Sequence, residues 1–166
     1  MAGVVAAMRE TGVRPGEPVL LVGHSQGGLI AAAVAADPVV RREFSIRQVI
    51  TSGAPIASVP IPEDVPVLSI EHDDDLVPRL DAAANDDRPN WITVTAPAPV
   101  EDLPSADRSE PLIAHRLELY QRTAAQIDRS ADPSLVRRRA ELSSLLGGPE
   151  RTVSGWDVEI SRAVTS

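Results

Sequence analysis

Val19-Leu-Leu-Val-Gly-His-Ser-Gln-Gly-Gly28 is the stretch that decides the fold. A short apolar run ends in the pattern G-x-S-x-G, with Ser25 at its centre, and an alanine-rich segment of helical character follows at once. A strand, this turn and a helix are together typical of a nucleophile elbow, in which small flanking residues allow a sharp turn and the serine stands exposed at its apex. We therefore predict that Ser25 is a nucleophile and that the backbone N–H of Gln26 stabilises an oxyanion on the substrate.

The segments on either side of this stretch alternate between strand and helix patterns. Helices are predicted over residues 2–11, 26–36, 113–128 and 132–147, and strands over residues 19–22, 46–52, 67–70 and 91–95. The strand at 19–22 is apolar throughout, as expected of a strand buried on both faces of a parallel sheet. The alternation predicts an α/β fold, with a parallel sheet flanked by helices.

Two further patterns concern the C-terminal part of the chain. Val158 and Ile160 alternate with polar residues and predict an additional edge strand. The charged run Arg137-Arg138-Arg139 is expected to lie on a solvated helix face, since the rest of the chain is acidic.

Composition excludes several classes of function. The 166 residues carry a formal net charge of −8, which argues against binding to nucleic acid or to an anionic membrane surface. The chain has no cysteine, which excludes disulfides, thiolate catalysis and a zinc site built on cysteine. No apolar run approaches the length of a membrane span and residues 2–8 do not form a signal peptide, so we expect a cytoplasmic protein without stable membrane insertion.

A serine hydroxyl needs a base to accept its proton, and the chain offers three histidines. His24 neighbours Ser25 in the turn and is expected to pack or hydrogen-bond locally. His72 lies at the end of the third predicted strand, before an acidic run, and His115 lies at the entry to a later helix. In elbow-type folds the members of the site follow the order serine, acid, histidine, which selects His115 as the base.

The acid that orients the base is expected at the carboxyl end of a strand, where open α/β sheets gather their functional groups. Asp73, Asp74 and Asp75 all follow the third strand. Three adjacent carboxylates cannot all point inwards, because like charges would oppose their ionisation. The residues themselves leave Asp74 and Asp75 open, with Glu71 and Asp64 as remote alternatives.

Three motifs in this order resemble the α/β-hydrolase superfamily, and its lipase and esterase members in particular. They are the elbow at residues 20–28, Ser52-Gly-Ala-Pro55, and Asp74-Asp-Leu-Val-Pro78, which is similar to the acid loop of that superfamily. The resemblance covers residues 15–128 and implies that Asp74 is the acid and that His115, before a last helix bearing Tyr120, is the base. Residues 129–166 resemble no known motif.

The resemblance also implies elements that this chain lacks. Complete members of the superfamily carry several strands and a second oxyanion donor before the elbow. We therefore expect residues 1–166 to form a single, partial domain, the C-terminal part of the fold, with residues 129–166 as a C-terminal extension of uncertain role. A sheet without its N-terminal strands has an unpaired edge, which favours self-association.

The expected function is that of a serine hydrolase that cleaves an ester-like acyl bond in a small-molecule or lipid substrate, without metal or cofactor. Thioesterase, acyltransferase and lipid-anchor deacylase chemistry would use the same residues. The alternative is a catalytically weak or inactive hydrolase fragment that acts as a binding or assembly module. A phosphate cradle at the Gly-rich turn is disfavoured, because the lysine of the phosphate-binding motif is absent.

Overall fold

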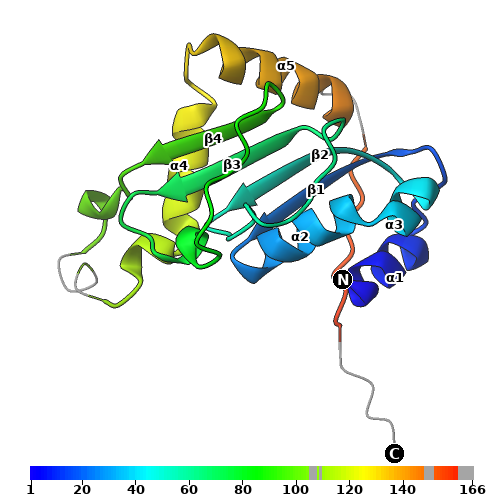
Figure 1. The fold of residues 1–166 in the computed structure, drawn as a ribbon, viewed down its shortest axis with the longest axis horizontal. Helices are drawn as coiled ribbons and strands as arrows, with labels where there is room; N and C mark the ends of the chain where they lie inside the picture. Colours follow the sequence, from blue (N-terminus) through cyan, green and yellow to red (C-terminus); the bar gives the residue numbers. More distant parts are fainter. Residues whose placement is uncertain (105–107, 109, 148–151, 161–166) are drawn as a thin grey trace, which may run out of the picture.

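The computed structural model describes residues 1–104, 108, 110–147 and 152–160 (Figure 1). Its elements in chain order are α1 (Ala2–Glu10), β1 (Pro18–His24), α2 (Gln26–Ala36), α3 (Pro38–Glu43), β2 (Ser45–Ser52), β3 (Val67–His72), the short 3-10 helix η1 (Val77–Arg79), β4 (Trp91–Ala96), the 3-10 helices η2 (Val100–Asp102) and η4 (Ile113–His115), α4 (Leu117–Ile127) and α5 (Pro133–Leu146).

The four strands form one parallel sheet in the order β1-β2-β3-β4. Their carboxyl ends are in register, since His24 pairs with Ser52, and His72 pairs with Ala96. The predicted α/β fold, with a parallel sheet flanked by helices, is confirmed. β1 is an edge strand of this sheet, and Val22 on it is 65% exposed, so the expectation that this strand is buried on both faces is wrong.

Helices cover both faces of the sheet (Figure 1). On one face α1, α2 and α3 pack over a core of small and branched residues, among them Ala32, Val34 and Val49, which are fully buried. On the other face Leu68 and Ile70 of β3 contact α4 and α5. The alanines of α2 let the helix approach the sheet closely, and Gly28 allows a close contact with the turn after β2, since a Cβ there would lie 2.5 Å from the Cβ of Ala54.

The helix predicted over residues 113–128 is interrupted. Residues 113–115 form η4, Arg116 is extended, and α4 begins only at Leu117. Leu117, the first residue of α4, is 48% exposed, whereas Leu119 is completely buried. The interruption releases the backbone of His115 from the helical ladder, so that its carbonyl can be bound by a side chain from elsewhere in the fold.

Of three expectations for the C-terminal part, one is wrong, one holds only in part and one is confirmed. In the charged run Arg137 is exposed, as expected, but Arg138 is only 6% exposed. The Arg138 guanidinium donates to Glu141 at 2.9 Å and to the carbonyl of Asn90 at 3.1 Å. Residues 152–160 form no strand. The start of α5 is as predicted, with the Asp132 carboxylate accepting the N–H of Ser134 at 2.8 Å as its N-cap.

None of the helices in the described ranges combines the length and the apolar character needed to cross a membrane.

Candidate active site

Ser25 stands at the apex of a strained turn between β1 and α2. Its backbone dihedral angles are φ 55° and ψ −127°, a region that costs a non-glycine residue about 1–3 kcal/mol and persists only where the surroundings enforce it. The N–H of Ser25 donates to the carbonyl of Ser52 at 2.9 Å, and its own carbonyl accepts the N–H of Gly28 at 3.0 Å. β2 and α2 together therefore hold the strained residue in place.

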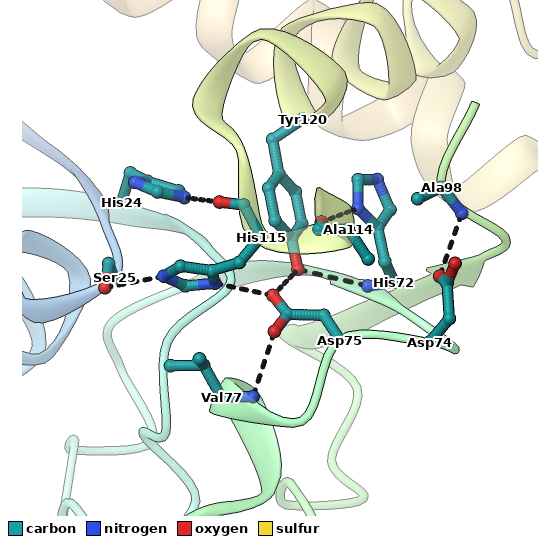
Figure 2. A network of polar contacts seen from close by, with 10 residues as sticks. All are labelled: His24, Ser25, His72, Asp74, Asp75, Val77, Ala98, Ala114, His115 and Tyr120. Carbon is teal, nitrogen blue, oxygen red and sulfur yellow. Dashed lines mark hydrogen bonds and ion pairs between the residues drawn. The ribbon is translucent and has the colours of Figure 1, made fainter. Parts of the chain in front are cut away.

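Ser25, His115 and Asp75 form a continuous hydrogen-bonded line (Figure 2). The Ser25 Oγ lies 2.8 Å from Nε2 of His115, and Nδ1 of His115 lies 2.7 Å from Oδ2 of Asp75. A carboxylate only accepts, so Nδ1 carries the proton and donates it to Asp75. In the neutral imidazole Nε2 is then free to accept the hydroxyl proton of Ser25, which is the arrangement that general-base activation of a serine requires.

The carboxylate that lies beside His115 is that of Asp75 and not that of Asp74, the residue expected there. Oδ1 of Asp74 accepts the backbone N–H of Ala98 at 3.1 Å and thus faces the loop after β4. Asp75 is the carboxylate that reaches His115, and its side chain is completely buried. The physical reason is a tight turn after β3, closed by a 3.1 Å bond from the N–H of Asp75 to the carbonyl of His72, which sends adjacent side chains to different sides of the loop.

Three donors converge on the buried Asp75 carboxylate. Oδ2 accepts from His115 and, at 2.7 Å, from the hydroxyl of Tyr120, while Oδ1 accepts the N–H of Val77 at 3.0 Å. Such bonds compensate the loss of solvation that a buried negative charge suffers. Burial, and next the hydrogen bond to Asp75, raise the pKa of Tyr120 above its ordinary value, so the phenol keeps its proton and remains a donor.

The other two histidines hold the turn that carries His115. Nδ1 of His72 donates to the carbonyl of Ala114 at 2.7 Å, and Nε2 of His24 donates to the carbonyl of His115 at 2.9 Å (Figure 2). His72 is 1% exposed, and its second nitrogen lies 2.9 Å from the Thr123 hydroxyl. All three histidines of the chain thus meet at one turn, and two of them act on consecutive carbonyls rather than on Ser25.

Gly53, directly after β2, lies against the rings of Tyr120 and His115. It has a φ of +58°, and a Cβ there would lie 2.9 Å from Cε2 of Tyr120 and 3.1 Å from Nδ1 of His115. The turn Ser52-Gly-Ala-Pro55 therefore leaves just enough room for the two rings.

Gln26 is the first residue of α2 and directly follows Ser25. The first N–H groups of a helix have no carbonyl partner within the helix and carry the positive end of its dipole. This position suits the expected role of the Gln26 N–H as an oxyanion donor. For a metal ion, the described parts of the chain hold no group of three or more His, Cys, Asp or Glu side chains in suitable positions.

The half-buried His24 is expected to make the stability of the folded chain depend on pH. Burial is the main cause that lowers the pKa of His24 below its ordinary value of 6.5. The unfolded chain therefore binds this proton more readily, and the contribution of His24 to stability is lost as the pH falls below about 6.5. Acidification from pH 7 to pH 5 is expected to lower the midpoint temperature of thermal unfolding more in the wild type than in His24→Gln. Equal losses in both proteins would contradict this assignment.

A parallel sheet flanked by helices, with a serine at the turn after a strand and a histidine and buried carboxylate beside it, defines the class of α/β hydrolases. Residues 4–103 match the model of one family of this class, described as the PGAP1-like alpha/beta domain, and the chain belongs to that family. A search of curated proteins and a search of solved structures each found no match. The family match includes Ser25 and Asp75 but ends before His115.

Proposed function

We propose that this chain is a serine hydrolase that cleaves an ester-like acyl bond in a small-molecule or lipid substrate, with Ser25 as nucleophile, His115 as base and Asp75 as the acid that orients it. One observation carries the proposal: the 2.8 Å and 2.7 Å contacts that join the three side chains in line. Membership of an α/β-hydrolase family supports the same class of reaction.

The first half of the proposed reaction forms an acyl-enzyme. The Ser25 Oγ attacks the substrate carbonyl carbon, and its proton passes to Nε2 of His115. The carbonyl oxygen becomes an oxyanion, which the N–H of Gln26 stabilises from the start of α2. Collapse of this intermediate breaks the bond to the alcohol oxygen, which takes the proton from His115 as it leaves.

The second half restores the enzyme. His115, neutral again, accepts a proton from water as the water oxygen attacks the acyl carbon. The bond to the Ser25 Oγ then breaks, and Nε2 returns the proton to the serine. Throughout, the Asp75 carboxylate accepts the hydrogen bond from Nδ1 of His115 and stabilises the positive charge that His115 carries transiently.

A fluorophosphonate probe tests this proposal, because it forms a stable phosphoester with an activated serine. We expect covalent labelling of the purified chain at Ser25, found by mass spectrometry of the peptide that contains it, and no labelling of Ser25→Ala. Labelling that persists in Ser25→Ala would remove Ser25 from this role. A folded wild-type chain that is not labelled at all would favour the other hypothesis, an inactive hydrolase domain that serves as a binding or assembly module.

A further inference from the structure

Tyr120 and His115 share a single oxygen of Asp75. Each donates to Oδ2 at 2.7 Å, one through its hydroxyl and the other through Nδ1–H (Figure 2). The Asp75 side chain is 0% exposed, so water does not stand in for either donor. At such a site, a hydrogen bond from one donor reduces the negative charge on Oδ2 that stabilises the other donor.

The Tyr120 hydroxyl is fixed in its role as a donor. Its oxygen accepts the backbone N–H of His72 at 3.2 Å, which leaves its own proton directed at Asp75. The ring is stacked on the His72 ring, with centroids 3.8 Å apart and planes inclined by 11°. His72 is itself bound at both nitrogens, so the phenol cannot swing away without breaking a buried network.

We propose that Tyr120 is a positioning residue that sets the pH range in which His115 acts as a base, through the Asp75 oxygen that both residues use. The inference rests on the function proposed for Ser25, His115 and Asp75. A second donor withdraws negative charge from Oδ2, so the protonated imidazole of His115 is stabilised less. His115 therefore becomes free to accept the serine proton at a lower pH than it would without Tyr120.

Other titratable groups surround this pair. His24 from β1 lies against the His115 ring, with centroids 4.8 Å apart, and Arg116 is paired with Glu110 and Glu118. From β3, His72 stacks on Tyr120, and Glu71 acts on the phenol through its charge. Among these groups, in the part of the chain that the structure describes, His115 and Tyr120 are the two that bond to the carboxylate.

The test compares Tyr120→Phe with the wild type in two measurements. The first is the rate of fluorophosphonate labelling between pH 5 and pH 9. The second is the NMR titration of the His115 ring signals, assigned with His115→Gln. We expect the midpoint of the labelling rate and the midpoint of the His115 titration both to move to higher pH by about one unit in Tyr120→Phe. A purely structural loss would lower the whole curve without moving its midpoint.

Tyr120 is the only tyrosine of the chain, which permits a test of opposite sign. Biosynthetic incorporation of 3-fluorotyrosine alters this one phenol and makes it a stronger donor, so both midpoints are expected to move to lower pH. The fluorotyrosine protein also tests the role of Tyr120 if Tyr120→Phe does not fold. Thr51→Val is the matched control, because it removes a hydroxyl that is equally buried but bonds to Ser69, and its midpoints are expected to stay in place.

The two proposals fail in different ways. Loss of labelling in the wild type, or labelling in Ser25→Ala, overturns the proposed function. An unchanged NMR midpoint of His115 in Tyr120→Phe and in the fluorotyrosine protein overturns the role of Tyr120, whether or not Ser25 reacts. Equal shifts in Tyr120→Phe and Thr51→Val overturn it as well, since the effect would then be one of general packing.

Discussion

Asp75→Asn is expected to lower the rate of hydrolysis of an activated ester, such as a p-nitrophenyl ester, by about ten-thousand-fold. Both oxygens of Asp75 accept hydrogen bonds, from Val77 on one side and from His115 and Tyr120 on the other. An asparagine offers one accepting oxygen and one donating nitrogen. If the nitrogen faces His115, the imidazole is driven into the tautomer that carries its proton on Nε2, which can no longer accept the proton of Ser25.

Asp74→Asn is the matched variant, one position away in the same loop. The Asp74 side chain accepts the N–H of Ala98, a bond that an asparagine oxygen can keep, so we expect its rate to stay within about twofold of the wild type. Thermal unfolding of both variants separates a catalytic effect from a loss of fold. A large loss in Asp74→Asn with a normal rate in Asp75→Asn would return the acid to Asp74 and contradict the geometry.

The choice between these two aspartates marks the limit of what the sequence could predict. The elbow could be predicted from the sequence, because it depends on neighbouring residues alone. Gly23 and Gly28 must be small, and Ser25 must be strained, for β1 to turn into α2. His115 followed from chain order. Neighbouring carboxylates in a loop differ only in the direction in which each side chain points. This direction is set by contacts with Ala98 after β4 and with Tyr120 on α4, which are distant in sequence.

The roles of His24 and His72 were hidden for a related reason. Each binds a backbone carbonyl, 91 and 42 positions away along the chain respectively. Every residue has a backbone carbonyl, so no sequence motif can predict which carbonyl a histidine binds. The same contacts explain why the helix predicted from residue 113 begins only at Leu117. The carbonyls of Ala114 and His115 accept hydrogen bonds from histidine side chains instead of from the next turn of a helix.

Gly23→Ala is expected to be the most damaging single methyl addition in the elbow. A Cβ at this position would lie 2.3 Å from both the carbonyl carbon and the carbonyl oxygen of Gly27, and 2.5 Å from the nitrogen of Gly28. All three are backbone atoms, so no side chain can rotate away. We expect the free energy of unfolding to fall by about 3 kcal/mol or more, measured by urea denaturation, and fluorophosphonate labelling to be lost.

The surrounding structure cannot relax to admit this methyl group. β1 cannot retreat, because Gly23 is paired with Thr51 of β2. α2 cannot move outwards without losing the contact of Gly28 with the sheet and the bonds that α2 makes to the carbonyl of Ser25. Gly27→Ala is the control, since a Cβ there meets nothing within 4 Å and lies in a helix, where alanine is favoured by about 0.5–1 kcal/mol over glycine. If Gly23→Ala were as stable as Gly27→Ala, β1 and α2 would have to separate freely, and the strain at Ser25 would not be enforced by their packing.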